Sequence, residues 1–292
     1  MSLKKILITG SNGQLARSLN FTFSKSLFKI VNVSLNSGHG TNIVSDLSDS
    51  KNVSKIIDNF KPDFIINCAA FTNVDLCEEK KEKAYKANVL IVKNLLKYMP
   101  KESKLIQVST DYIFDGLKSP YNEEATPNPL NYYGKTKLEA ENLIRSSRKK
   151  YIILRTGNIF SEFSDLPSNR LNWILNNLKN NKPILAATDM ISKPTHTASI
   201  AKLLVEMLSF NQNLIVNYCG QDSLSIYDFS LLVSKVFQFD KNLITPCKIS
   251  DLPLKARRPQ NVSLKTNLIS NLIDCNIYET EYSLSIIKNI LS

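Results

Sequence analysis

The sequence predicts an α/β fold in which a doubly wound parallel sheet is followed by a smaller C-terminal α/β lobe. Short apolar runs alternate with amphipathic helical segments over the first half, which is typical of βαβ units. Farther along, proline-containing loops separate shorter elements. We therefore assign residues 1–160 to the sheet domain and 161–292 mainly to a substrate-binding lobe, with some later elements returning to the sheet.

The apolar periodicity gives each expected element a residue range. Strands are expected at 6–9, 30–34, 64–67, 105–109 and 152–155, with shorter ones at 184–187 and 215–218. Helices are expected at 13–23, 53–59, 80–98, 131–145, 169–179, 197–208 and 226–237.

The first expected strand ends in a glycine turn that leads directly into a helix. Gly10 and Gly13 follow residues 6–9, and Ala16 completes a G-x-x-G-x-x-A spacing. Glycine lets the backbone approach a pyrophosphate, whose charge is favoured by the helix N-terminus. An ordinary strand-to-helix turn would use the same glycines, so a Rossmann-type dinucleotide site needs support from elsewhere in the chain.

That support comes from Tyr133 and Lys137, which lie four residues apart on the helix expected at 131–145. Residues i and i+4 share a helix face, so the phenol and the ammonium project together. We expect the cation to lower the pKa of the tyrosine. Thr110, at the end of the strand expected at 105–109, would hold a carbonyl oxygen beside it. The three residues form a candidate catalytic set for protonating a ketone while a hydride arrives.

Composition narrows the class of protein. A hydrophobic content of 43% and a charged content of 22% are typical of a globular protein. The sequence has neither an apolar run long enough to span a bilayer nor a signal-peptide-like N-terminus. We therefore expect a cytoplasmic protein that does not associate with a membrane. Five dispersed cysteines predict reduced thiols, and neither the two distant histidines nor the acidic residues predict a metal site. The net charge of +11 suits anionic ligands, but the lysines are too dispersed to predict nucleic-acid binding.

The residues after the second strand bear on the choice of cofactor. NAD sites usually end this strand with an acid that binds the ribose hydroxyl, and the segment 33–40 contains none. Arg17 could contact a 2′-phosphate, although a solvated position on the first helix is an equal alternative. We predict NADPH, with NADH as the alternative.

A series of sequence blocks extends this pattern along nearly the whole chain. They are G-S-N-G-Q-L at 10–15, D-L-S-D at 46–49, N-C-A-A-F-T-N-V-D at 67–75, S-T-D-Y-I-F-D-G at 109–116, P-Y-N-E at 120–123, P-N-P-L-N-Y-Y-G-K-T-K at 127–137, L-R-T at 154–156, K-P-T at 193–195 and R-R-P-Q-N-V-S-L at 257–264. In order and spacing they resemble the extended short-chain dehydrogenase/reductases, and within them the dTDP-4-dehydrorhamnose reductase family.

The resemblance implies reduction of a nucleotide-activated 4-keto-6-deoxy sugar, with hydride from NAD(P)H and a proton from Tyr133. It places the reaction in deoxysugar biosynthesis for cell-surface polysaccharide and suggests a homodimer. The residues expected at the cofactor are Gly10, Gly13, Gln14, Leu15, Arg17, Asp46, Leu47, Ala69, Ala70, Phe71, Tyr133 and Lys137. Those expected at the substrate are Thr110, Asp111, Asn158, Arg257 and Arg258.

Two segments depart from the family pattern. The family carries a tryptophan in R-T-S-W-V-Y, and Asn158 stands in its place here. The family's D-Q-x-G-x-P-T reads D-M-I-S-K-P-T at 189–195. Both lie where the resemblance implies the sugar and nucleotide, so the reaction type is expected to hold while the sugar is left open. Asp111 could equally form a turn, and Arg257 and Arg258 could be surface charges, or one of each.

Three other activities compete with a reductase. A nucleotide-sugar dehydratase similar to this chain would have a second acid after Thr110-Asp111, where Tyr112 stands. A nucleotide-sugar epimerase of the same superfamily remains an alternative. So does a non-catalytic regulatory subunit of the same fold, similar to that of methionine adenosyltransferase, although the complete Thr110, Tyr133 and Lys137 set favours catalysis.

Overall fold

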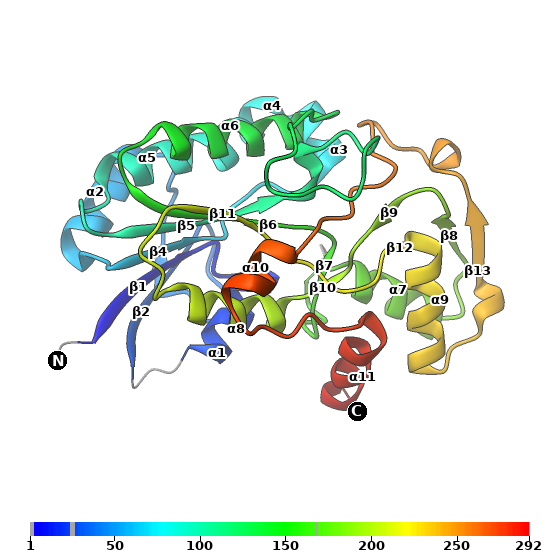
Figure 1. Cartoon of the computed structure of the whole chain (residues 1–292). Coiled ribbons are helices and arrows are strands. Elements are labelled where there is room, and N and C mark those ends of the chain that lie inside the picture. Colours follow the sequence, from blue (N-terminus) through cyan, green and yellow to red (C-terminus); the bar gives the residue numbers. More distant parts are fainter. Residues whose placement is uncertain (1–2, 24–26, 167–168, 292) are drawn as a thin grey trace.

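A parallel sheet of seven strands forms the centre of the computed structural model, which describes residues 3–23, 27–166 and 169–291 (Figure 1). Its order is β11-β6-β5-β4-β1-β2-β3, and each neighbouring pair is parallel. The strands are β1 (Lys4–Thr9), β2 (Phe28–Ser34), β3 (Ile43–Val44), β4 (Phe64–Asn67), β5 (Lys104–Thr110), β6 (Lys150–Thr156) and β11 (Leu214–Asn217). The order reverses between β1 and β4, where doubly wound sheets bind ligands beyond the carboxyl ends of the strands. The predicted fold class is confirmed.

Helices cover both faces of this sheet (Figure 1). One layer contains α2 (Ser50–Phe60), α5 (Ile91–Tyr98) and α6 (Tyr132–Ser146); the other contains α1 (Gln14–Thr22) and α8 (Thr197–Met207). Successive strand residues point to opposite faces. Leu7 of β1 therefore packs in the core of the first layer, whereas Ile6 and Ile8 pack in the core of the second.

The helix expected at 80–98 is helical from Lys81 to Tyr98, but its middle turn is a π turn that the sequence did not indicate. The chain forms α3 (Val74–Glu79), α4 (Lys81–Tyr85), a π-helical turn at Lys86–Leu90 and then α5. In the π turn, Asn88 accepts a hydrogen bond from the backbone N–H of Phe71 at 2.7 Å and donates one to its carbonyl. Such turns often occur at functional sites because they redirect a side chain out of the regular helical pattern.

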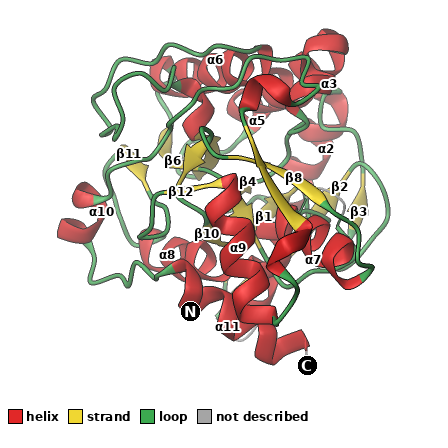
Figure 2. Cartoon of the chain, turned by 90° about the vertical axis from the view of Figure 1, so that its right-hand side faces the viewer, coloured by secondary structure: helices red, strands yellow, loops and turns green. Residues whose placement is uncertain are grey.

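The second half of the chain builds a separate hydrophobic core. Here α7 (Arg170–Lys179), α9 (Ile226–Phe237) and α11 (Thr280–Leu291) surround β8 (Ile184–Ala187), which pairs in parallel with β13 (Ile244–Cys247). Figure 2 shows the molecule from the side of these three helices. Two smaller pairs are β7 (Ile159–Phe160) with β10 (Thr195–His196) and β9 (Ile191–Ser192) with β12 (Leu224–Ser225). Meanwhile, β11 and α8 return to the first sheet, as expected; the boundary at residue 160 stays a prediction.

Several elements have no counterpart among the predictions. Besides α3, α11 and the short strands, these are α10 (Asn267–Leu272) and 3-10 turns at Asp111–Ile113, Lys241–Leu243 and Ile249–Asp251. They are short or lie in the irregular second half, where packing outweighs local periodicity. Within the described ranges, no helix combines the length and apolarity needed to span a bilayer.

Candidate active site

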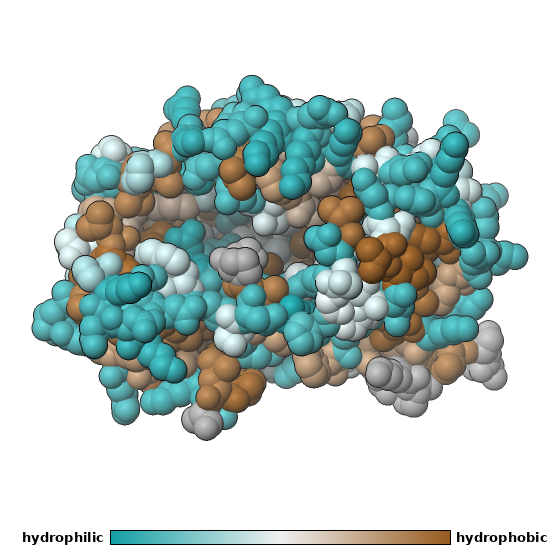
Figure 3. Space-filling model, turned by 180° about the vertical axis from the view of Figure 1, so that it is seen from behind, coloured by the Kyte–Doolittle hydropathy of each residue, from teal (hydrophilic) through white to brown (hydrophobic). Residues whose placement is uncertain are grey.

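A cavity of about 1280 Å³ lies between the carboxyl ends of the sheet strands and the second-half elements. Figure 3 shows the molecule from the side opposite to that in Figure 1. The surface is hollowed near its middle, and mostly hydrophilic side chains surround the hollow. Most of the residues predicted from the sequence line the cavity: Gly10, Gly13, Gln14, Leu15, Asp46, Leu47, Ala69, Ala70, Phe71, Thr110, Asp111, Tyr133, Lys137, Asn158 and Arg258. These residues therefore meet in one cavity, and the role of each stays a prediction.

The glycine turn has the geometry that a pyrophosphate requires. Gly10 has a φ of +66°, and a Cβ there would stand 2.7 Å from the backbone nitrogen of Ala69. Gly13 precedes α1 without a side-chain cap, and the first turn of α1 contains no acid. The first backbone N–H groups of a helix have no partner within it, so this end can receive an anion. The turn therefore fits a dinucleotide.

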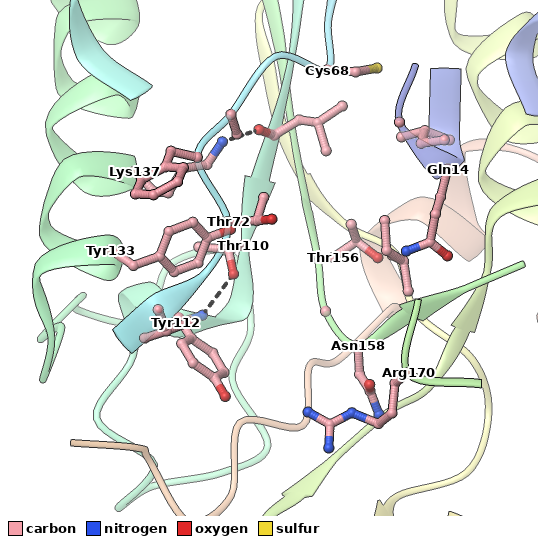
Figure 4. A pocket seen from close by; sticks show the side chains of 18 of the residues that line it. Gln14, Cys68, Thr72, Thr110, Tyr112, Tyr133, Lys137, Thr156, Asn158 and Arg170 are labelled. Atoms are coloured by element: carbon pink, nitrogen blue, oxygen red, sulfur yellow. Dashed lines mark hydrogen bonds between the residues drawn. The ribbon is translucent and has the colours of Figure 1, made fainter. Parts of the chain in front are cut away.

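The catalytic candidates come from two neighbouring elements (Figure 4). Thr110 ends β5, and Tyr133 and Lys137 lie on the first turns of α6. The Lys137 ammonium donates a hydrogen bond to the Val108 carbonyl at 2.6 Å. Thr110 Oγ1 accepts one from Tyr112 N–H at 3.2 Å and donates to Asp111 at 3.1 Å. These contacts fix the hydroxyl and the ammonium beside the phenol.

The expected lowering of the Tyr133 pKa is not found. Burial raises the pKa of Tyr133, and a hydrogen bond with Thr110 offsets this only in part. Burial also lowers the pKa of Lys137 to about 8, with Glu141 acting in the opposite direction. For both groups, the loss of solvation shifts the pKa more than the charges nearby do, and the spacing of the two residues in the sequence does not reveal this effect. The phenol is consequently protonated at neutral pH, as a proton donor must be.

A buried ion pair fixes α6 against the sheet. Arg155 of β6 and Glu141 of α6 are 2% and 0% exposed, and their closest N–O distance is 2.7 Å. Ser109 of β5 donates to the same carboxylate at 2.5 Å, and Arg155 also donates to the Glu123 carbonyl. Because Glu141 follows Lys137 by one helical turn, this network orients the catalytic face. The sequence analysis overlooked Glu141, although its i+4 spacing from Lys137 was a usable signal.

A second set of contacts secures the start of α6 and the neighbouring loop. Asn88 donates to Thr136 Oγ1 at 2.9 Å while it holds the Phe71 backbone. A side-chain carbon at Gly134 would collide with the Tyr112 carbonyl oxygen, so this first turn packs directly on the 3-10 turn after Thr110. Asn88 also escaped sequence analysis, because nothing in the local pattern indicates a π turn.

The opposite side of the cavity carries polar groups without partners. Asn158 has a left-handed φ of +44°, which asparagine tolerates better than most residues. Its Nδ2 atom and the Thr156 hydroxyl oxygen are buried without a hydrogen-bond partner among the described residues. Arg170 and Trp173 of α7 line the same cavity. Of these, only Asn158 was predicted as a site residue; Arg170 and Trp173 were missed because α7 carries no recognisable motif.

Asp111 lies at the base of the substrate side. Burial raises its pKa to about 7, and the hydrogen bond from Thr110 lowers it in part. A methyl group at Gly157 would collide with its carboxylate, so the two segments are in close contact. The carboxyl group thus lies inside the chamber, close to the proposed proton donor, and is not confined to a surface turn.

Two predicted residues lie outside the cavity. Arg17 forms a bidentate ion pair with Asp165 at 2.7 and 2.9 Å, so its guanidinium is directed at the 161–166 segment and is neither solvated nor part of the cavity lining. Arg257 is exposed and also absent from that lining. Arg258, by contrast, lines the cavity and pairs with Asp75 at 2.9 Å. Of the two adjacent arginines, one is therefore a surface charge and the other a cavity residue.

Comparison with known proteins agrees with this site. Residues 4–290 match a family model described as the RmlD substrate binding domain. A dTDP-4-dehydrorhamnose reductase from Aggregatibacter actinomycetemcomitans is 33% identical, over 90% of each chain. The chain belongs to the dTDP-4-dehydrorhamnose reductase family. The predicted family and oxidoreductase class are confirmed.

Solved structures extend the likeness to the whole fold. A dTDP-4-dehydrorhamnose reductase from Clostridium acetobutylicum aligns with a TM-score of 0.87 at 30% identity, covering 98% of this chain and 99% of the other. The reductase from Bacillus anthracis, solved in complex with NADP, aligns over all of both chains with a TM-score of 0.91 at 23% identity. Methionine adenosyltransferase 2 subunit beta from Rattus norvegicus is 28% identical, over 92% of this chain and 82% of its own length.

Proposed function

We propose that this protein reduces the 4-keto group of a nucleotide-activated 6-deoxy sugar, with NADPH as reductant, in deoxysugar biosynthesis for cell-surface polysaccharide. The proposal depends on one observation: Thr110, Tyr133 and Lys137 line the same cavity as the glycine turn before α1. The reaction consumes one ketone, one NADPH and one proton, and yields one secondary alcohol and NADP⁺. The cytoplasmic location and the homodimer stay predictions.

The chain's own residues suit the cofactor. The uncapped start of α1 and the closely packed Gly10 would receive the pyrophosphate, and the cavity residues Asp46 and Leu47 would flank the adenine. A reduced nicotinamide, when bound, supplies the hydride. The absence of an acid at 33–40 supports NADPH, as does the NADP complex of the Bacillus anthracis reductase.

The proton would come from Tyr133. Its partly buried phenol stays protonated until negative charge develops on the substrate oxygen, and Thr110 supplies a second hydroxyl at the same place. Lys137, held by the Val108 carbonyl, stabilises the phenolate that remains after proton transfer. A positioned proton donor of this kind typically contributes about 10²–10⁴-fold to the rate.

The observations favour the reductase over the two alternatives. An epimerase would regenerate its cofactor within each turnover, and a regulatory subunit would not need the three catalytic candidates in one chamber. The likeness to methionine adenosyltransferase 2 subunit beta does not outweigh the higher identity to a reductase. The reductase therefore remains the function that the site supports best.

The test is the loss of NADPH absorbance with enzymatically prepared dTDP-4-keto-6-deoxy sugar. We expect one NADPH to be oxidised for each sugar reduced, and slower oxidation with NADH. Epimerised product without net NADPH oxidation would favour the epimerase instead. A chain that binds NADPH but changes no ketosugar would contradict the proposal.

A further inference from the structure

Arg170 is a cation without a neutralising partner on the substrate side of the cavity. It occupies the first turn of α7 and lines the chamber, and no described carboxylate pairs with it. Burial lowers the pKa of Arg170, and the nearby Arg258 guanidinium lowers it further. Arg170 is partly buried, so an anionic ligand in the cavity can compensate its charge with less competition from water than at an exposed site. The amide nitrogen of Asn158, another cavity residue, likewise lacks an acceptor.

Arg258 differs from Arg170 although both line the same cavity. Its guanidinium already contacts the Asp75 carboxylate and donates to the Ala256 carbonyl, each at 2.9 Å. This ion pair connects the segment around Arg258 to α3, and it neutralises the charge. Arg170 therefore supplies a positive charge beside Asn158 that, unlike Arg258, no carboxylate of the described residues pairs with.

Trp173 follows Arg170 by three residues, so both project from one face of α7. Trp173 is 45% exposed although it lines the cavity, together with Leu185 at 53% and Leu254 at 36%. Exposed apolar side chains gathered at the wall of a cavity commonly mark a ligand surface. A planar heterocycle can stack on an indole regardless of its hydrogen-bonding pattern.

We propose that Arg170 and Trp173 form a nucleoside-diphosphate site on α7, with the guanidinium at the diphosphate and the indole against the base. A guanidinium fork matches phosphate oxygens, and the three-residue spacing places the aromatic surface one helical turn away from it. The inference rests on the proposed function, because a nucleotide-activated sugar carries both groups. It assigns substrate recognition to two residues outside the sequence blocks of the family, on the side of the cavity where Asn158 replaces the expected tryptophan.

The test uses the protein's only tryptophan as a built-in probe. Adding dTDP to the full-length protein should quench Trp173 emission, and titration calorimetry gives the matching affinity. Arg170→Gln should weaken dTDP binding about 10- to 100-fold and leave thymidine binding unchanged, since thymidine has no phosphate. Trp173→Ala should weaken both ligands about tenfold, measured by calorimetry. Lys179→Gln removes an exposed cation at the other end of α7 and should bind as the wild type does.

Turnover separates this inference from the proposed function. With the ketosugar as substrate, Arg170→Gln should raise KM about 10- to 100-fold with kcat within about threefold, because the diphosphate is distant from the bond that changes. If the ketosugar is not reduced but dTDP binding still depends on Arg170, the nucleotide site stands and the reductase fails. If the ketosugar is reduced and Arg170→Gln keeps wild-type KM and dTDP affinity, the site is wrong. An unchanged Trp173 emission on saturation with dTDP would also overturn it.

Discussion

The two sides of the cavity differ in how their buried polar groups are satisfied. On the catalytic side, Lys137 donates to a backbone carbonyl, and Glu141 receives hydrogen bonds from Ser109 and Arg155. On the substrate side, the Asn158 amide nitrogen and the Thr156 hydroxyl have no such partners in the described structure, and the partly buried Arg170 forms no ion pair there. A buried group that is already paired holds a geometry, whereas an unpaired one carries a desolvation cost that a ligand can relieve.

Under the proposed function, this difference separates residues that would position the chemistry from residues that would recognise the substrate. The catalytic side is preorganised, so its positioning residues should affect stability as well as rate. The substrate side is incomplete without ligand, so changes there should affect affinity more than stability. Each of the following predictions tests one part of this division.

The largest effect is expected for Tyr133→Phe, which removes only the proton donor of the preorganised side. Turnover of the ketosugar should fall about 10²–10⁴-fold while NADPH binding is kept, as measured by NADPH absorbance and by titration. Tyr132→Phe is the matched control, because Tyr132 does not line the cavity. Near-wild-type turnover in Tyr133→Phe would show that another group donates the proton.

Glu141→Gln tests whether the paired network is structural. It leaves the buried Arg155 guanidinium without its counter-charge, and removing one partner of a buried ion pair typically costs about 3–5 kcal/mol. The urea midpoint should fall accordingly, with the slope of the transition unchanged. Glu139→Gln, an exposed change on the same helix, should stay within about 0.5 kcal/mol of the wild type. If the two variants were equally stable, the Glu141 network would not be structural, and the two sides of the cavity would not differ in the way described above.

Asp111→Asn sharpens the comparison through pH. The Asp111 pKa is raised by burial from 3.8 to about 7, so the folded state holds this proton more tightly than the unfolded state. The resulting stability is fully present below about pH 4 and is lost as the pH rises through about 7. Relative to Asp111→Asn, the wild type should therefore lose up to about 4 kcal/mol over this window, measured by urea unfolding at several pH values. A difference independent of pH would place the carboxylate in a solvated position.

The smallest effect is expected for Arg17→Met. Its partner Asp165 is 53% exposed and remains hydrated when the ion pair is lost, so the cost should be about 1 kcal/mol or less. The ratio of KM values for NADPH and NADH should change less than about threefold, because the guanidinium is not in the cavity lining. A selective loss of NADPH affinity would restore the sequence-based assignment of Arg17 to the 2′-phosphate.

That Thr110, Tyr133 and Lys137 meet the glycine turn in one cavity could be predicted from the sequence, because these residues belong to local patterns. The glycine turn follows a strand directly, and Tyr133 and Lys137 share a helix face through their spacing alone. The strands predicted at 64–67 and 184–187 match β4 and β8 residue for residue, because short apolar runs bounded by polar residues define them. By contrast, the π turn at Asn88 interrupts a continuous helical pattern and left no signal.

The sequence by itself determined the α/β fold and, through its blocks, the family. It also singled out Thr110, Tyr133 and Lys137 as the candidate catalytic set, since their types and spacing are local features of the chain. Only the tertiary structure decided which cations reach the cavity. Arg17 is drawn to Asp165, Arg257 faces solvent, and Arg170 enters the chamber from a helix without a motif. It also reversed the expected pKa shift of Tyr133. The physical reason is the same in both cases: burial and ion pairing depend on segments that meet only when the chain folds.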